Sequence, residues 1–188
     1  ADSMADRLTW VVGDAMALDL PPASRDVVVS GLVLNFLPDR GKALVGMAAV
    51  ARPGGTAGYY VWDYPNAGVG VMAAFWRAAV TLNPAAAELR ETARFADCTE
   101  AGLTTLAAGA GLGQVRSTAI EVPTVFADFD DLWTPFTLGT GPAPGYCASL
   151  DPAERDALRK MLAQQVPVAL DGRIHLTAKA WAVAGVAG

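Results

Sequence analysis

The sequence predicts an α/β fold whose sheet is organised around one βαβ unit. The apolar run Asp26–Ser30 is bounded by turn-forming residues, as is typical of a strand buried on both faces of a parallel sheet. Helical periodicity follows over residues 39–51, and Arg52-Pro53-Gly54-Gly55 ends it. Thr56–Trp62 is the next predicted strand. It runs parallel to the first if the intervening helix is a right-handed crossover.

Further elements flank this unit on both sides. Leu8–Val12 is rich in β-branched and aromatic residues and ends at Gly13, which predicts a short strand before the unit. The charged segment 88–98 favours no single element. The other predicted elements are, in chain order, a helix over 69–82, a helix from Thr99 to Gly111 or Gly113, a strand over 114–123, a short helix over 128–136, a loop over 139–145, a helix from the Ser149–Pro152 cap to about Gln165, a turn at Asp171-Gly172 and a strand over 174–183.

Length and composition favour a single domain over residues 1–188 that acts on a small molecule. The chain has 188 residues, of which 53% are hydrophobic, so it has enough apolar surface for a sizeable core. Its net charge is −5 and it has no basic tract, which gives nucleic-acid backbones and anionic membrane surfaces little to bind. We therefore expect a small-molecule substrate, and neither nucleic acid nor a membrane as a partner.

The cysteine and histidine content argues against a metal centre. Cys98 and Cys147 are far apart and His175 is the only histidine, whereas zinc sites need clustered ligands at short spacing. We interpret His175 as a structural residue. Two cysteines make no disulfide framework, and no charged-then-apolar leader opens the chain. These features predict a cytoplasmic protein without a metal.

The run from Gly13-Asp14-Ala15 through Ser30-Gly31-Leu32 to Trp62-Asp63-Tyr64 resembles the middle of a class I S-adenosylmethionine-dependent methyltransferase. The group it is most similar to is the methyltransferase type 11 group, with the quinone-biosynthesis methyltransferases. The resemblance implies a Rossmann-like methyltransferase sheet that is mostly parallel and has an antiparallel C-terminal strand pair. It also implies that residues 124–172 form a helical insert between the last two strands and line part of the acceptor pocket.

One expected part of that family is not found in this sequence. Such enzymes usually begin with a strand and a glycine-rich loop that approaches the cofactor, and nothing before Trp10 has this pattern. The chain therefore resembles the distal two-thirds of a methyltransferase, with the N-terminal strands missing. We expect the complete gene product to supply a strand, a glycine-rich loop and a helix upstream, and we expect weak or no cofactor binding without them.

The resemblance places the cofactor beside the first two of these motifs. In the family, an acid at the position of Asp14 accepts a hydrogen bond from the adenine amino group, and a neighbouring backbone N–H contacts the ring. In the same family, the segment that corresponds to Ser30-Gly31-Leu32 follows the buried strand and passes beside the methionine and ribose portions of the cofactor. The alternative for Asp14 is that it is an ordinary turn-forming aspartate. The alternative for Gly31 is that it only allows the chain to turn between the strand and the next helix. The residues expected to bind S-adenosylmethionine are Asp14, Ala15, Met16, Ser30, Gly31 and Leu32.

Polar and aromatic residues near the strand ends are candidates for the acceptor pocket. Aromatic faces also attract a sulfonium or another cation. The expected substrate-binding residues are Asn35, Phe36, Trp62, Tyr64 and Trp76. The alternative is that Trp62, Tyr64 and Trp76 only pack in the core. The sequence does not identify a general base, so no catalytic residue is named.

Methyl transfer from S-adenosylmethionine to a small-molecule acceptor is the function that this pattern favours. Two alternatives stay open, namely a methyltransferase-like binding or scaffold domain without activity and an NAD-linked oxidoreductase. Gly68–Ala73 matches a dinucleotide fingerprint, but Tyr64-Pro65-Asn66 separates it from the preceding strand and no suitably placed acid follows. The glycine cluster Ala108–Gly113 is typical of a helix C-cap. A homodimer is left open.

Overall fold

The computed structural model describes residues 7–188 and contains a four-stranded mixed sheet in the order β1-β2-β4-β3. The strands are β1 (Arg25–Gly31), β2 (Ala51–Trp62), β3 (Gly113–Phe126) and β4 (Ile174–Val186). β1 and β2 are parallel, whereas β4 runs antiparallel to both β2 and β3. The predicted α/β class, the parallel βαβ unit and the antiparallel final pair are therefore confirmed.

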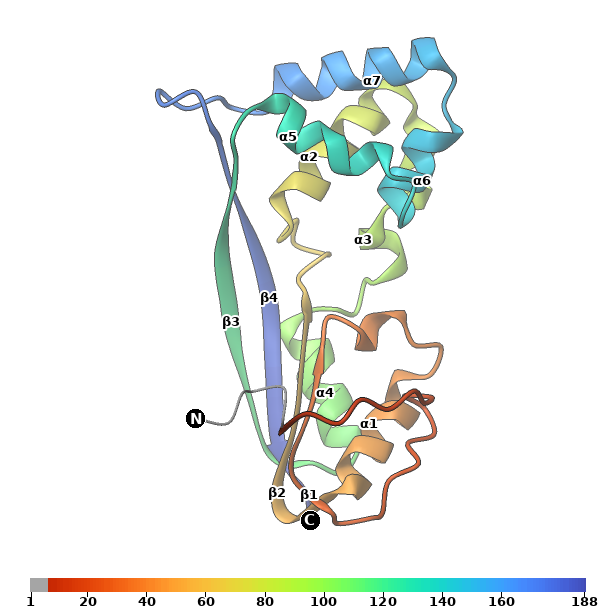
Figure 1. Cartoon of the computed structure of the whole chain (residues 1–188), viewed down its shortest axis with the longest axis vertical. Helices are drawn as coiled ribbons and strands as arrows, with labels where there is room; N and C mark the ends of the chain where they lie inside the picture. Colours follow the sequence, from red (N-terminus) through yellow and green to blue (C-terminus); the bar gives the residue numbers. More distant parts are fainter. Residues whose placement is uncertain (1–6) are drawn as a thin grey trace.

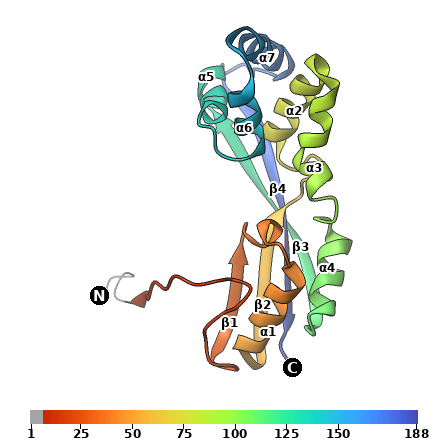
Figure 2. The same ribbon diagram turned by 90° about the vertical axis from the view of Figure 1, so that its right-hand side faces the viewer.

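Helices gather at the two ends of the long strands β3 and β4. In Figures 1 and 2, α1 and α4 lie at the lower end near the C-terminus, and α2, α5, α6 and α7 lie together at the upper end. The helices are α1 (Arg40–Val50), α2 (Gly70–Leu82), α3 (Glu91–Arg94), α4 (Glu100–Gly109), α5 (Phe129–Trp133), α6 (Pro142–Ser149) and α7 (Pro152–Gln165), with 3-10 turns η2 (Leu34–Phe36), η3 (Pro84–Leu89) and η4 (Thr134–Thr137).

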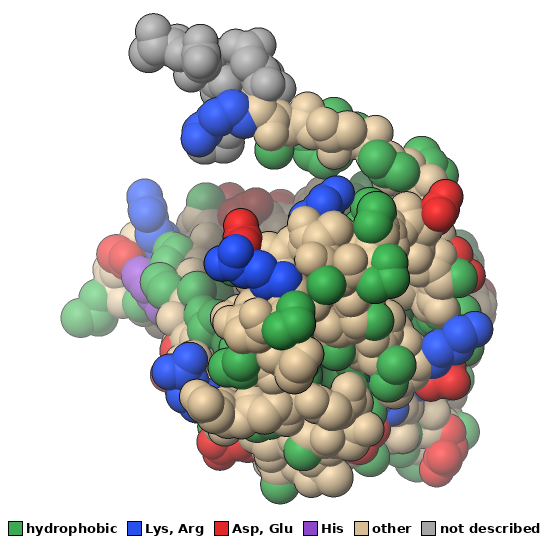
Figure 3. Space-filling model, turned by 90° about the horizontal axis from the view of Figure 1, so that it is seen from below, with side chains coloured by type: hydrophobic (Ala, Val, Ile, Leu, Met, Phe, Trp, Pro, Cys, Tyr) green, Lys and Arg blue, Asp and Glu red, His purple; other side chains and the backbone are tan. Residues whose placement is uncertain are grey.

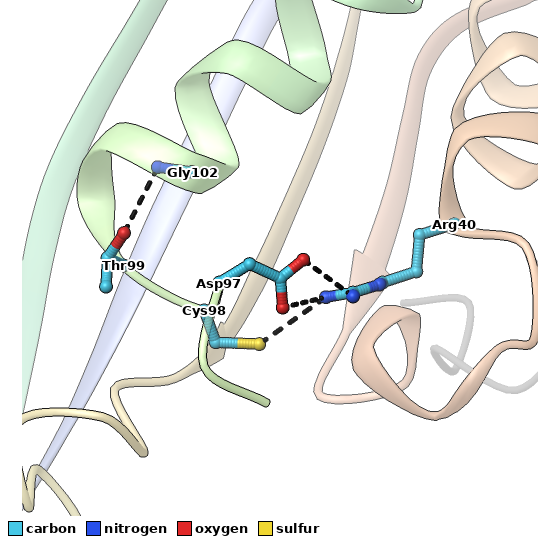
Figure 4. A network of polar contacts seen from close by, with 5 residues as sticks. All are labelled: Arg40, Asp97, Cys98, Thr99 and Gly102. Carbon is cyan, nitrogen blue, oxygen red and sulfur yellow. Dashed lines mark hydrogen bonds and ion pairs between the residues drawn. The ribbon is translucent and has the colours of Figure 1, made fainter. Parts of the chain in front are cut away.

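Polar side chains fix the starts of the helices. The Asp39 carboxylate accepts a hydrogen bond from the Lys42 N–H at 2.8 Å and so begins α1. At α7, Asp151 and Glu154 form a reciprocal capping box that pairs two otherwise unbonded backbone donors. Thr99 caps α4 by accepting from the Gly102 N–H at 3.1 Å (Figure 4). The sequence predicted each of these helices close to where it begins.

An ion pair links α1 to the segment that leads into α4. The Arg40 guanidinium contacts the Asp97 carboxylate at 2.6 Å and the Cys98 sulfur at 3.7 Å (Figure 4). Cys98 is buried, and burial raises the pKa of its thiol to about 11, so the thiolate form is disfavoured at neutral pH. Both cysteines are free and buried.

Two hydrophobic cores correspond to the two groups of helices. The lower core fills the space between the sheet and helices α1 and α4, and the upper core fills the space between α2 and the helices between β3 and β4. The lower core contains Leu34, Leu44, Met47, Tyr59, Val61, Phe95, Cys98, Leu103 and Val183 among others, and the upper core contains Phe75, Trp76, Leu132, Trp133, Phe136, Leu158, Leu162 and Ile174.

The predicted strand Leu8–Val12 is wrong. This segment has no regular structure, and Trp10 is 87% exposed. A strand needs a hydrogen-bonded partner, and none of the strands in the described range pairs with it. High β-propensity alone therefore does not produce a strand here.

The expectation that β1 is buried on both faces is also wrong. Val28 packs against the lower core, but Val29, which points to the opposite face, is 74% exposed. β1 is an edge strand in the described sheet, and its continuous apolar sequence does not distinguish one covered face from two. Because two of the three described strand pairings are antiparallel, the sheet is mixed rather than mostly parallel.

Two boundaries differ from the prediction. β2 begins at Ala51, so Arg52-Pro53-Gly54-Gly55 lies at the start of a strand, where the pairing of β1 with β2 shifts register. The predicted loop 139–145 contains the first turn of α6, because a proline at the first helical positions needs no N–H partner. The uncertain segment 88–98 contains the end of η3 and α3.

Charge is distributed without a dominant patch on the face seen in Figure 3. Lysine and arginine side chains alternate there with aspartate and glutamate. Among residues 7–188, no helix combines the length and apolar character needed to cross a bilayer. Within the same range, no three histidine, cysteine or acidic side chains are grouped so that they could hold a metal ion.

Candidate functional site

A first cavity of about 280 Å³ lies at the carboxyl end of β1. It brings together Ala15, Ser30 and Gly31, three of the residues predicted to bind the cofactor. The rest of its wall is apolar and comes mainly from β1, η2 and α1, with Leu34, Ala43 and Met47 among the lining residues. Ligands of open α/β sheets bind at this end of the strands.

Asp14 lies in an exposed turn before β1. Its Oδ1 accepts a hydrogen bond from the Met16 N–H at 2.8 Å, and the Ala17 N–H donates to the Asp14 carbonyl oxygen at 3.0 Å. The Met16 side chain packs against the lower core but does not line the first cavity. The carboxylate of Asp14 therefore closes its own turn in this structure, as the turn-forming alternative expects.

The backbone leaves β1 in an unusual conformation. Leu32 has a φ of +57°, a left-handed conformation that is uncommon for a residue with a side chain. Its N–H donates to the Tyr60 carbonyl oxygen at 2.9 Å, which holds the turn in place. Such strain is found mostly at functional sites. A Cβ on the preceding Gly31 would lie 2.6 Å from the Tyr60 hydroxyl, so that glycine makes room for a protein side chain.

An aromatic row connects the end of β1 with the end of β2. Phe36, in η2, meets Phe95 edge to face with ring centroids 5.5 Å apart, and the Tyr64 ring is tilted against Phe95 with centroids 5.1 Å apart. Asn35 is buried beside Phe36, and its Nδ2 has no hydrogen-bond partner. An unpaired buried amide is unfavourable, and it marks Asn35 as a group that a ligand could satisfy.

Two further cavities lie beyond this row, under α2 and α3. The second cavity, of about 400 Å³, is lined by Tyr64, Trp76 and Val80, and the third, of about 290 Å³, by Phe36, Tyr64 and Phe136. Tyr64, Met72 and Glu91 belong to the walls of both cavities. Of the residues predicted to bind the substrate, Phe36, Tyr64 and Trp76 each line at least one of these two cavities, whereas Asn35 and Trp62 line neither.

Sequence reasoning missed Glu91 as a site residue. This glutamate is only 4% exposed, and the Trp76 indole N–H donates to its Oε2. Burial raises the pKa of the carboxyl group. Burial and then the charge of Glu91 raise the pKa of Tyr64 to about 12, so the phenol keeps its proton. In the sequence, Glu91 is a single acidic residue in a polar segment, and nothing there indicates that it is buried. Its burial depends on the packing of α2 over α3.

Asp63 and the glycines after it have structural roles. The Asp63 carboxylate is fully buried, accepts a hydrogen bond from Asn66 at 2.7 Å and lies 3.5 Å from the Lys179 ammonium. A Cβ on Gly68 would come within 2.7 Å of the Asp63 carbonyl oxygen, and one on Gly70 within 2.9 Å of the Thr177 carbonyl oxygen. The glycines of the dinucleotide-like motif therefore allow close packing of the chain on itself and on β4.

The remaining motifs also have local explanations. Gly111 has a φ of +85° just after α4, the conformation expected for a helix C-cap. The exposed His175 ring contacts the Asp171 carboxylate at 2.9 Å, which ties the turn before β4 to the strand. Asp128 caps α5 by accepting from the Asp131 N–H at 2.8 Å.

The first cavity fits part of S-adenosylmethionine. Its apolar wall suits the flat adenine ring, and Asn35, which follows the lining residue Leu34 in the chain, has a buried amide donor without a partner. None of the described residues that line this cavity is acidic, so the ribose hydroxyls find no carboxylate there. The residues present would therefore contact the adenine rather than the ribose hydroxyls.

Comparison with known proteins agrees with this geometry. The family model of the methyltransferase domain matches residues 1–58, which include β1, α1 and the start of β2. The predicted resemblance to the methyltransferase domain is confirmed for this part of the chain. The substrate of this chain is not established by the match.

Solved structures extend the likeness to the whole sheet. A Bacillus halodurans protein assigned to the methyltransferases is 12% identical, with a TM-score of 0.54 over 96% of this chain and 78% of its own. An Anabaena variabilis protein assigned as a methyltransferase of antibiotic biosynthesis is 15% identical, with a TM-score of 0.56 over 93% of this chain and 72% of its own. At these low identities the structural similarity supports a conclusion about the fold alone, which is that of the sheet in these two structures.

A third structure was solved with the cofactor. It is phosphoethanolamine N-methyltransferase 2 of Haemonchus contortus in complex with S-adenosyl-L-methionine, 15% identical, with a TM-score of 0.46 over 92% of this chain and 35% of its own.

The buried Glu91 carboxyl predicts a pH-dependent stability. Because its pKa is raised in the folded protein, its contribution is most favourable below the ordinary pKa of glutamate and declines as the pH rises through the raised value. Glu91→Gln removes this decline. The variant should gain stability relative to wild type as the pH rises, by at most about 1.4 kcal/mol per pH unit.

Urea denaturation from about pH 4 to about pH 8 measures this difference. Glu121→Gln is the matched control, because Glu121 is exposed on β3 and should show no such trend. A difference between Glu91→Gln and wild type that stays constant with pH would contradict the prediction.

Proposed function

We propose that the protein transfers the methyl group of S-adenosylmethionine to a small-molecule acceptor. The observation that carries this proposal is the arrangement of cavities at the carboxyl ends of the parallel pair β1 and β2. The first cavity holds three of the predicted cofactor residues, and the second and third hold three of the predicted acceptor residues. Phe36 and Tyr64, which both contact Phe95, belong to the wall of the third cavity.

The chain's own residues would bind and orient the two reactants. When bound, S-adenosylmethionine supplies a methyl group already activated as a sulfonium, so a protein nucleophile is not required. Ala15, Ser30 and Gly31 would hold the cofactor side, and Tyr64, Met72 and Trp76 would enclose the acceptor. Apolar walls exclude water, and fixed placement of the acceptor lowers the entropic part of the barrier.

A binding domain without activity is the second candidate. It is favoured by the first cavity, which offers no carboxylate for the ribose among its described lining residues. A domain of this kind would still bind a small molecule in the second and third cavities. Measured methyl transfer separates the two functions.

Calorimetric titration of the full-length protein with S-adenosylhomocysteine and with NAD tests the cofactor. We expect S-adenosylhomocysteine to bind and NAD to give no signal, because the glycines at 68 and 70 pack against protein backbone. Tight binding of NAD without a response to S-adenosylhomocysteine would reverse the assignment.

Asp14→Ala tests the adenine contact in the same assay. Loss of a charge-assisted hydrogen bond costs roughly 1.5–3 kcal/mol, which is about tenfold to a hundredfold in affinity. The turn at Asp14 also loses its bond from the Met16 N–H, whereas Asp14→Asn keeps an acceptor oxygen and should cost less. Asp19→Ala, at another exposed acid before β1, is the control. Unchanged affinity in a folded Asp14→Ala variant would remove Asp14 from the cofactor site.

A further inference from the structure

Glu91 presents an unused hydrogen-bond acceptor where the second and third cavities meet. It belongs to the walls of both. Its Oε2 is taken by the Trp76 indole N–H, while its Oε1 is buried without any partner. A buried acceptor of this kind is an exception in folded proteins and needs an explanation.

No cation of the described residues is paired with Glu91, although Arg90, whose buried Nε also has no hydrogen-bond partner, lines the second cavity with it. Glu91 forms none of the ion pairs found among residues 7–188. The guanidinium of Arg77, which also lines the second cavity, donates to the Gln165 side chain at 3.0 Å instead. Desolvation without a counter-charge is what raises the pKa of the carboxyl. None of the described side chains donates a hydrogen bond to Oε1, which leaves this position to a ligand.

The remaining walls define the body of that partner. Met72, Ala73 and Val80 line the second cavity, and Val71, Leu132 and Phe136 line the third. A purely apolar ligand would fill this space but leave Oε1 unpaired. A ligand with an apolar body and one hydrogen-bond donor satisfies both features.

We propose that the methyl acceptor is a small apolar molecule carrying a hydroxyl or amine hydrogen, and that Glu91 Oε1 accepts a hydrogen bond from this group. The proposal rests on the proposed function for naming the ligand as the methyl acceptor. Glu91 is in this sense a specificity residue, because a molecule without the donor hydrogen leaves the carboxyl unpaired. The methylated ether of a hydroxyl ligand is such a molecule.

Ligand-observed NMR titration with matched probes tests this on the full-length protein. The probes are 4-ethylphenol and 4-ethylaniline, which carry a donor hydrogen, and 4-ethylanisole, which does not. Each is small enough for a cavity of about 400 Å³. We expect both donors to bind about tenfold to a hundredfold more tightly than the ether, because the ether leaves a buried acceptor unpaired at a cost of about 1–3 kcal/mol.

Glu91→Gln should abolish this preference. The Trp76 N–H requires an acceptor, so the amide oxygen takes that bond and the amide NH₂ replaces Oε1. A donor then faces the ligand, and the ether should bind as well as the phenol or better. Glu121→Gln, on the exposed surface of β3, should keep the wild-type preference, and circular dichroism checks that both variants are folded.

Three results would overturn the proposal. They are equal affinities of wild type for the phenol and the ether, no binding of any probe, and an unchanged preference in Glu91→Gln. The titration with S-adenosylhomocysteine separates this proposal from the proposed function. If that ligand fails to bind while the probe preference holds, methyl transfer is refuted and the Glu91 site stands.

Discussion

Phe75→Ala is expected to lower the free energy of unfolding by about 3–5 kcal/mol, the range for truncating a buried phenylalanine. Phe75 is fully buried at the centre of the upper core. Its ring stacks on Phe136 with centroids 4.3 Å apart and meets Trp76 edge to face at 5.3 Å. Truncation removes both contacts and leaves a cavity that the surrounding helices fill only in part.

Urea denaturation followed by circular dichroism measures the loss. Leu82→Ala is the matched control, because Leu82 lies at the end of the same helix and is half exposed. It should change stability by no more than about 0.5 kcal/mol. Equal costs for the two substitutions would show that α2 does not pack as described.

The position of Phe75 also connects stability to the acceptor side of the site. Phe136 lines the third cavity and Trp76 lines the second, so Phe75 supports one wall of each. The variant should therefore bind 4-ethylphenol more weakly even where it remains folded. Weakened binding reflects the lost support for Trp76 and Phe136, since Phe75 lines neither cavity.

The βαβ unit could be predicted from sequence because local signals and tertiary packing agree there. The apolar run of β1, the cap at Asp39 and the helical periodicity before Ala51 each point to the same element order. Leu8–Val12 shows the opposite case. Its composition favours a strand, but a strand depends on a partner, and local composition carries no information about one.

The candidate site could be predicted only in part, for the same reason. Tyr64 was expected because it follows a strand whose carboxyl end faces a ligand, and Phe36 because it follows β1. Glu91 was not expected, since its role depends on Trp76, 15 residues earlier in the chain, and on the burial of both. Trp62 matched the same aromatic pattern as Tyr64, yet it lines neither of the two acceptor cavities, because β2 ends at Trp62 and Tyr64 lies in the turn that follows.

Leu44→Ala is expected to cost about 2–5 kcal/mol of unfolding free energy. Leu44 is fully buried in the lower core, on the face of α1 that packs against the sheet. Its helix neighbours Ala43 and Met47 line the first cavity. Loss of the Leu44 side chain should therefore loosen α1 and weaken S-adenosylhomocysteine binding as well as stability. Val45→Ala, at an exposed position of the same helix, is the control and should change stability by no more than about 0.5 kcal/mol.

Combining Leu44→Ala with Phe75→Ala tests whether the two cores are energetically independent. The lower and upper cores share no buried residue, so the two losses should add within about 0.5 kcal/mol. Each single variant should also weaken one ligand more than the other, with S-adenosylhomocysteine affected by Leu44→Ala and 4-ethylphenol by Phe75→Ala. A large coupling energy, or equal effects of both substitutions on both ligands, would mean that the two sides of the site depend on one core. Independent losses would instead support a site assembled from two separately stabilised halves that meet at the row Phe36–Phe95–Tyr64.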